Sequence, residues 1–298
     1  MKFVTFQLDG KDRAGLLSED RVIDINKASN GKIPADLLSI LENYEAFENE
    51  LKELTGEGIS LSSVKLRAPL PKPSSIRDFY AFEEHVKTAR GRRGLEMIPE
   101  WYEVPVFYFT NHRAVIGPND QVQIPQNCAR MDYELEIACI ISKEGRNISI
   151  DDADKYILGY TIMNDWSARD LQAHEMKVGL GPSKGKDFAT SFGPWIVTKD
   201  ELEHLKTEKS YDLEMTASIN GNVISRGNFS SIYYSFAKLI AHASKDATLY
   251  PGDIIGSGTV GTGCILELGE DTHRWLQDGD EVELSITGLG KLKNTVRK

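Results

Sequence analysis

Met131-Asp132-Tyr133-Glu134-Leu135-Glu136-Ile137-Ala138 is the most informative segment of this 298-residue chain, and an apolar run continues it to Ile141. Residues two apart in a β-strand share a face, so both glutamates project together while Leu135 and Ile137 project to the opposite side. The apolar run predicts a strand that enters a hydrophobic core. Two carboxylates beside a core repel each other unless a cation or a proton compensates them. Taken alone, such a pair is more often a solvated polar face.

A further acidic residue, Asp165, ends the apolar run from Ile157 to Asn164. An acid at the end of such a strand can meet the glutamate pair across a sheet. Three carboxylates without a neighbouring cysteine suit Mg²⁺, Mn²⁺ or Ca²⁺, whereas zinc normally requires histidine or cysteine. A third segment, Asp78-Phe79-Tyr80-Ala81-Phe82-Glu83-Glu84-His85, carries an acid and a histidine seven residues apart. By itself, a histidine in this setting is more often structural.

The chain is expected to form two domains, residues 1–68 and residues 69–298. Short strand-like runs and one helix over residues 34–54 characterise the first, and three prolines within residues 68–73 favour an extended crossing at the boundary. The second is rich in strands and poor in helices. Strands are expected over residues 133–141, 157–164, 192–197, 254–257 and 280–286, with a hairpin over residues 212–225 that turns at Asn220-Gly221. The fold class is therefore β-rich mixed α+β, not a doubly wound nucleotide-binding fold.

Composition limits the classes of function. The chain carries 45 acidic and 35 basic residues, a net charge of −10, which disfavours a general nucleic-acid partner. Its three cysteines, Cys128, Cys139 and Cys264, have neither disulfide-framework nor zinc-site spacing. No segment approaches the roughly 20 apolar residues of a membrane helix. A soluble cytoplasmic protein that takes a small anionic partner, without nucleic acid or membrane, is expected.

Several segments together resemble the fumarylacetoacetate hydrolase superfamily, in the form of its smaller bacterial members. The resemblance covers the chain from about Asp78 to its C-terminus. It departs from the family pattern at Ala189, where the hydrolase proper has glycine. The matching segments are Asp78-Phe79-Tyr80 with His85, Tyr133-Glu134-Leu135-Glu136, Met163-Asn164-Asp165-Trp166-Ser167-Ala168-Arg169-Asp170-Leu171-Gln172, Gly185-Lys186-Asp187-Phe188 and Gly256-Ser257-Gly258-Thr259.

The resemblance implies a β-sandwich roll as the catalytic domain, a small N-terminal α+β domain and a homodimer. It implies one divalent cation, Mg²⁺ or Mn²⁺ with Ca²⁺ as a further option. His85 would be the general base and Glu267 the acid that orients it. The family's substrate-binding arginine has no single counterpart in this chain, because Arg90, Arg92 and Arg93 are all candidates. The remaining implied roles are metal ligation by Asp78, Glu134, Glu136 and Asp165, substrate and oxyanion donation by Arg169, Gln172 and Lys186, and pocket lining by Tyr80, Tyr108 and Thr259.

These roles predict a metal-dependent hydrolase that cleaves a carbon–carbon bond in an acylpyruvate or a fumarylacetoacetate-like 1,3-diketo acid. A pair of His85 and Glu267 would activate the water that such a hydrolysis needs. The alternative is a lyase that decarboxylates a β-oxo acid such as oxaloacetate, or an isomerase of the same superfamily. A metal-binding protein without catalysis would require a missing ligand or base, and none is missing.

Overall fold

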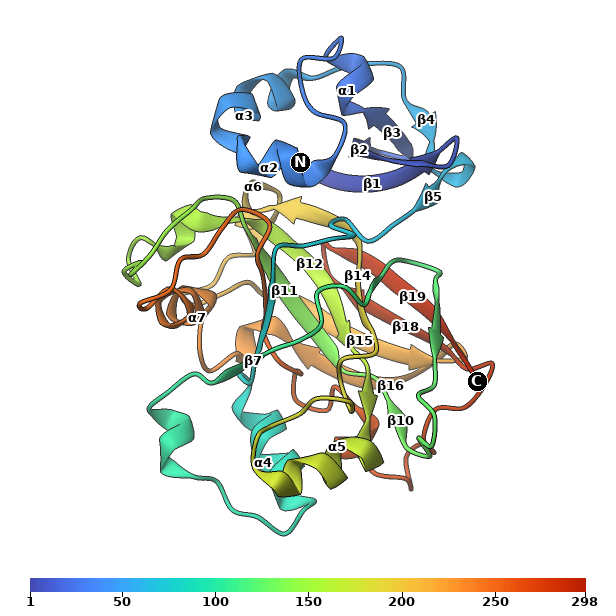
Figure 1. Ribbon diagram of the computed structural model, residues 1–298, viewed down its shortest axis with the longest axis vertical. Helices are drawn as coiled ribbons and strands as arrows, with labels where there is room; N and C mark the ends of the chain where they lie inside the picture. The colour runs from blue at the N-terminus through green and yellow to red at the C-terminus, as the bar shows by residue number, and fades with distance from the viewer.

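A computed structural model describes residues 1–298 as a small N-terminal unit above a larger body built on two sheets (Figure 1). In the N-terminal unit the expected helix over residues 34–54 is divided at Asn43, whose backbone N–H donates to the last carbonyls of the first helix. The unit consists of β1 (Lys2–Leu8), β2 (Lys11–Ser18), β3 (Arg21–Asp24), α1 (Ile25–Ala28), α2 (Leu37–Glu42), α3 (Tyr44–Glu53), β4 (Ile59–Ser60) and β5 (Lys65–Leu66).

One large sheet runs through both parts of the molecule, in the order β4-β3-β2-β1-β14-β12-β11-β17-β6-β7. The join is the antiparallel pairing of β1 with β14, in which Lys2 lies opposite Val197 and Phe3 opposite Ile196. The boundary at residue 68 therefore separates two regions of one sheet, and it stays a prediction. The strands of the body are β6 (Ile76–Phe79), β7 (Phe107–Phe109), β8 (Val115–Ile116), β11 (Leu135–Ile141), β12 (Ile157–Asp165), β14 (Thr190–Thr198) and β17 (Ile254–Gly256).

The second sheet has the order β16-β15-β18-β19-β9 and packs against the large one. The expected hairpin forms β15 (Glu214–Ile219) and β16 (Asn222–Asn228). Asn220 and Gly221 have φ values of 50° and 81°, the two positive angles that a type I′ turn needs. The remaining strands are β9 (Gln121–Gln123), β18 (Glu281–Ile286) and β19 (Gly290–Arg297), and β10 (Met131–Asp132) pairs separately with β13 (Ser167–Ala168).

The two faces of the large sheet belong to different cores. On β11, Leu135, Ile137, Cys139 and Ile141 join the core between the two sheets. Ala138 and Ile140 project to the other face and join a core that includes residues of the N-terminal unit. Strand alternation thus explains why both sides of this segment are apolar. The β-rich mixed α+β class is confirmed.

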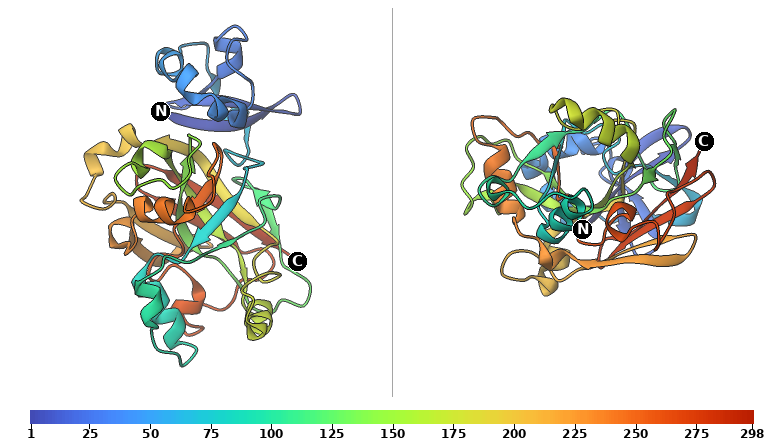
Figure 2. Two further views of the ribbon diagram at one scale, coloured as in Figure 1. Left: turned by 60° about the vertical axis from the view of Figure 1, so that its left-hand side comes forward. Right: turned by 90° about the horizontal axis from the view of Figure 1, so that it is seen from below.

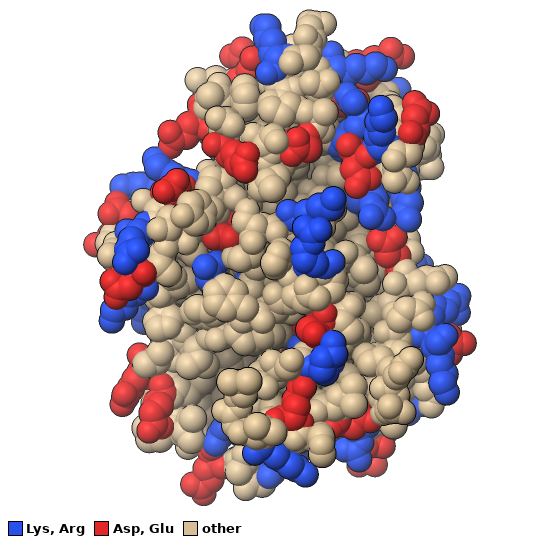
Figure 3. All heavy atoms as spheres, viewed as in Figure 1, with Lys and Arg blue, Asp and Glu red and all other residues tan.

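Two of the short helices of the body, α4 and α5, lie at its lower end (Figures 1 and 2). No helix of the structure combines the length and the apolar character that a membrane crossing requires. Acidic and basic side chains are interspersed over the face in Figure 3. The helices are α4 (Glu83–Gly91), α5 (Arg169–Glu175), α6 (Lys199–Leu202), α7 (Phe236–Ala243) and α8 (Ile265–Leu268).

Candidate active site

Three carboxylates converge where neighbouring strands of the large sheet end. Asp78, Glu136 and Asp165 are buried, and one ligand atom of each lies within 4.8 Å of the others. The strand order brings them together, since Gly256 of β17 pairs with Asp78 on one side and with Ala138 on the other. A Cβ on Gly256 would lie 2.5 Å from Asp78 Oδ1, so glycine at this position leaves the carboxylate its space.

The donor set fits a hard divalent cation. Glu136 Oε2 and Asp165 Oδ1 are buried without a hydrogen-bond partner, which is costly for carboxylate oxygens. Burial, together with the neighbouring acids, raises the pKa of Asp78 and of Glu136 well above their ordinary values. Burial also raises the pKa of Asp165. An oxygen-only set of this kind suits Mg²⁺, Mn²⁺ or Ca²⁺, and a cation between the carboxylates would compensate their charge.

Glu134, the fourth expected metal ligand, has cations on both of its oxygens. Arg169 Nη2 donates to Oε1 at 2.9 Å, and Lys186 Nζ donates to Oε2. Burial opposes ionisation of Glu134, but Lys186 and Arg169 outweigh it and hold the pKa of this carboxyl well below its usual range. Lys186 also donates to Asp165 Oδ2 at 2.6 Å. Glu134 and Asp165 therefore connect the side chains of Arg169 and Lys186 to the three clustered carboxylates. The role of Glu134 as a metal ligand stays a prediction.

His85 and Glu267 form a buried pair, with Nδ1 of the imidazole 2.5 Å from Oε1 of the carboxylate. Oε2 of Glu267 accepts the backbone N–H of Thr262 at 2.9 Å, so the acid is fixed from two sides. His85 lies in α4 and Glu267 in α8, 182 residues apart in the chain. Tyr80 packs edge-on against the imidazole, with 5.3 Å between ring centroids. Cys264 Sγ lies 3.6 Å from Oε1 as a further neighbour of the pair.

Asp132 organises both parts of the site, although sequence reasoning gave it no role. Its Oδ2 accepts Arg169 Nε at 2.8 Å, and its carboxylate accepts the backbone N–H groups of Ile265 and Leu266 at 2.8 and 3.1 Å. Those amides open α8, the helix that carries Glu267. The sequence shows an acid two residues before Glu134, but only the fold reveals which groups this acid binds.

The other expected site residues are also brought to this region. The Tyr108 hydroxyl donates to Asp165 Oδ2, and Thr259 Oγ1 donates to Glu136 Oε1 at 3.3 Å. Gln172 Oε1 accepts Arg169 Nη1 at 3.2 Å. Burial raises the pKa of Tyr80 to about 12, so its hydroxyl stays protonated near neutral pH.

Of the three arginines after His85, Arg92 has the firmest attachment. Its guanidinium donates to the carbonyls of Glu267 and Leu268 at 3.0 and 3.1 Å and so connects the end of α4 to α8. Arg90 donates to the carbonyl of Glu96 and Arg93 to that of Ala89. A role for any of them in substrate binding stays a prediction.

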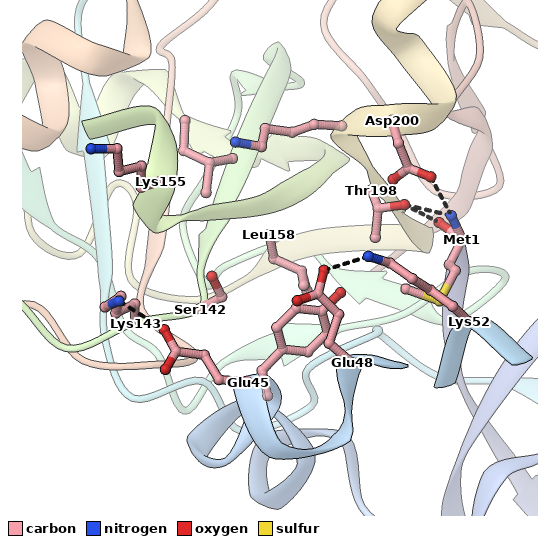
Figure 4. A pocket seen from close by; sticks show the side chains of 13 residues that line it. Met1, Glu45, Glu48, Lys52, Ser142, Lys143, Lys155, Leu158, Thr198 and Asp200 are labelled. Carbon is pink, nitrogen blue, oxygen red and sulfur yellow. Dashed lines mark hydrogen bonds and ion pairs between the residues drawn. The ribbon is translucent and has the colours of Figure 1, made fainter. Parts of the chain in front are cut away.

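A separate cavity of about 460 Å³ lies at the junction between the N-terminal unit and the larger body (Figure 4). Its charged side chains are paired locally, as Lys52 is with Glu48 at 2.8 Å and Lys143 with Glu45 at 2.7 Å. None of its lining residues has a buried polar atom without a partner. The chemistry is therefore concentrated at the acid cluster and the His85–Glu267 pair.

The chain is similar to a known protein family and to several individual proteins. Residues 74–297 match the family described as "Fumarylacetoacetate (FAA) hydrolase C-terminal". The oxaloacetate tautomerase YisK of Bacillus subtilis is 30% identical over 316 residues, which cover 99% of this chain and 100% of that protein. The fumarylacetoacetate hydrolase of Exiguobacterium antarcticum superposes with a TM-score of 0.79 at 27% identity, covering 100% of this chain and 99% of that one.

A third relative was crystallised with a metal. The maleylpyruvate hydrolase of Sphingobium sp. SYK-6, in complex with manganese(II) ion and pyruvate, superposes with a TM-score of 0.74 at 25% identity and covers 100% of this chain and 99% of that one. The family match extends over most of the chain and includes every residue of the acid cluster and of the His85–Glu267 pair. The chain belongs to the fumarylacetoacetate hydrolase family.

Proposed function

We propose that this protein is a metal-dependent hydrolase that cleaves a carbon–carbon bond in an acylpyruvate or a fumarylacetoacetate-like 1,3-diketo acid. The observation that carries the proposal is the buried pair of His85 and Glu267. A histidine whose ring is oriented by a carboxylate is the arrangement used for general-base activation of a nucleophile. Hydrolysis needs such a base, because neutral water is a poor nucleophile.

We assign the cation to Asp78, Glu136 and Asp165, with Glu134 as the fourth ligand that the family resemblance implies. Mg²⁺ or Mn²⁺ bound there would supply Lewis-acid polarisation of the substrate's carbonyl oxygens. The three acids meet at strand ends, so the backbone fixes their mutual positions. The pairing of Glu134 with Lys186 and Arg169 keeps these two positively charged side chains beside the proposed metal site.

His85 takes a proton from water in this mechanism. Nδ1 is held by Glu267, which leaves Nε2 as the ring nitrogen that can accept the proton. The hydroxide attacks the carbonyl carbon, the carbon–carbon bond breaks, and the leaving carbon departs as an enolate that takes up the proton held by His85. Glu267 stabilises the imidazolium that exists between these two proton transfers.

Lys186 and Arg169 supply positive charge for the oxygen of the tetrahedral state. An ammonium has three donors, and two of those on Lys186 are occupied by Glu134 and Asp165, so one remains. Arg169 uses three of its five N–H groups, on Asp132, Gln172 and Glu134. Such donors contribute about 3–4 kcal/mol each in other enzymes.

A second candidate is proton transfer at the carbon beside the 2-oxo group of oxaloacetate, as a tautomerase or, with loss of carbon dioxide, a decarboxylase. The relative that favours it is the oxaloacetate tautomerase of Bacillus subtilis, which matches over 99% of this chain. The same acid cluster would serve this reaction, but no water would need activation. Tautomerisation still needs a base to take the proton from carbon, whereas decarboxylation does not, so it is hydrolysis and decarboxylation that differ in what they require of His85.

The test compares His85→Ala with wild type on acetylpyruvate, fumarylpyruvate and oxaloacetate, each with saturating Mn²⁺. We expect hydrolysis of the acylpyruvates to fall by about 10²–10⁴-fold and decarboxylation of oxaloacetate to fall much less. His204→Ala, a change at an exposed histidine, is the matched control. An equal, small loss on all three substrates would refute the hydrolase and favour the decarboxylase, which needs no positioned base.

A further inference from the structure

Glu175 is a carboxylate with three backbone donors and no place in the mechanism above. It is the last residue of α5, the helix that begins with Arg169. Oε1 accepts the backbone N–H groups of Ser183 at 2.6 Å and Gly185 at 3.0 Å, and Oε2 accepts that of Lys184 at 2.8 Å. These are the three residues immediately before Lys186. Hydrogen bonds from N–H groups to a carboxylate are stronger than those between neutral groups.

The chain between Glu175 and this turn cannot hold the turn in place by itself. Val178 is 83% exposed and Leu180 is 93% exposed, so the segment makes few packing contacts. Gly179 and Gly181 have φ values of 88° and 111°, which are left-handed or irregular conformations that glycine adopts freely. Ordering such a segment costs conformational entropy that its own contacts do not offset. The Glu175 carboxylate joins the two ends of this segment by accepting the backbone N–H groups of residues 183–185.

The same turn lies directly on α5. The carbonyl of Gly185 accepts the backbone N–H of Ala168 at 2.8 Å. A Cβ on Gly185 would lie 2.7 Å from Cα of Gln172, so the turn touches the helix backbone. Lys186 then extends from the turn to Glu134 and Asp165. Helix and turn therefore carry the three donors, Arg169, Gln172 and Lys186, as one unit, with Glu175 at its far end.

We propose that Glu175 is a positioning residue that sets the location of Lys186 by binding the backbone amides of residues 183–185. The proposal rests on the proposed function only in giving Lys186 a part in turnover. Glu175 is half-buried, and removing its carboxylate exposes three amides at a surface where water can bind them. The fold should therefore persist while the turn relaxes. A displacement of about 1 Å in a catalytic group can cost on the order of 10²-fold in rate.

A double-mutant cycle tests the proposal, with Glu175→Ala, Lys186→Met and the double variant assayed on the best substrate at saturating Mn²⁺. We expect Lys186→Met to lower kcat by about 10²–10³-fold. We expect Glu175→Ala to lower kcat by about 10–10²-fold, with Mn²⁺ affinity changed less than threefold. In the Lys186→Met background, Glu175→Ala should have no further effect, because residues that act through one another are not additive.

Two more variants separate positioning from general stability. Glu175→Gln keeps one acceptor oxygen, so its kcat should lie between those of wild type and Glu175→Ala. If Glu175→Ala unfolds at a lower temperature than wild type, Glu175→Gln replaces it in the double-mutant cycle. Glu214→Ala, an exposed acid paired with Arg226 at 3.0 Å, should leave kcat unchanged. If Glu175→Ala lowers kcat by the same factor in the Lys186→Met background as in wild type, Glu175 does not act through Lys186. The same conclusion follows if Glu175→Ala alone leaves kcat unchanged. If Lys186→Met has wild-type activity, the role that the proposed function gives to Lys186 fails and this inference fails with it, whereas the hydrolase itself is tested separately through His85.

Discussion

Replacing Glu136 by glutamine should change stability in opposite directions with and without metal. Asp78, Glu136 and Asp165 have ligand atoms within 4.8 Å of one another. Two unit charges at that separation repel by roughly 3 kcal/mol at an effective dielectric constant of about 20. The pKa of Glu136 is raised by burial and by the neighbouring acids, so protonation relieves part of this repulsion. Metal-free Glu136→Gln should therefore be more stable than metal-free wild type, by on the order of 1–2 kcal/mol.

With metal the order should reverse. An ion present at about 100 times its dissociation constant stabilises the folded wild type by about 2.7 kcal/mol. For a chain of this size that corresponds to a rise in Tm of roughly 4–5 °C. The variant lacks one ligand charge, so its rise should be small or absent, and turnover should be lost.

Thermal unfolding with and without Mn²⁺, together with calorimetric titration, measures both effects. Glu214→Gln, which neutralises an exposed acid outside the site, should show the full wild-type shift. An unchanged Mn²⁺ affinity in Glu136→Gln would refute the metal site. A metal-free variant less stable than wild type would refute the argument from repulsion.

Two other changes test the network and the pH dependence. Asp132→Asn removes one of the two carboxylates that pair with the buried Arg169 and leaves Glu134 as the other, so we expect a loss of about 1.5–3 kcal/mol in urea unfolding together with lower kcat, whereas an unperturbed variant would contradict the organising role of Asp132. Burial opposes ionisation of Asp280, but hydrogen bonds from Arg274, Asn220 and the Gln277 amide outweigh it and lower its pKa to about 2. Because this folded pKa is depressed, the carboxylate stabilises the fold above its unfolded pKa of about 4, and the stabilisation disappears as pH falls toward 2. The difference in unfolding free energy between wild type and Asp280→Asn, about 1–2 kcal/mol above pH 5, should therefore shrink between pH 4 and pH 3, and a constant difference would contradict this assignment.

The segments with a clear periodicity could be predicted from the sequence. The strand expected over residues 157–164 forms β12, and the Asn220-Gly221 turn joins two strands as expected. The helix over residues 34–54 was wrong in its continuity, because the pattern of apolar residues continues past the break at Asn43. The pattern reports which face is buried, and it does not register a local change of backbone angles.

The sequence by itself determined that acids end or flank two apolar strands and that these acids suit a hard cation. Strand alternation puts Glu136 on a fixed face of β11, and Asp165 terminates β12, whatever the order of strands in the sheet. The family resemblance added the pairing of His85 with Glu267. No local sequence pattern can pair two residues that lie 182 positions apart in the chain.

Only the tertiary structure decided how the charges are shared. In the fold, Arg169 and Lys186 both donate to Glu134. Asp132 accepts from Arg169 and from the first amides of α8, and Glu175 accepts from the turn before Lys186. It also continued the large sheet across the boundary at residue 68 through the pairing of β1 with β14. The physical reason is that periodicity encodes only which side of an element is buried. Hydrogen bonds and ion pairs depend on distances between segments remote in the chain, and those distances are set when the whole fold packs.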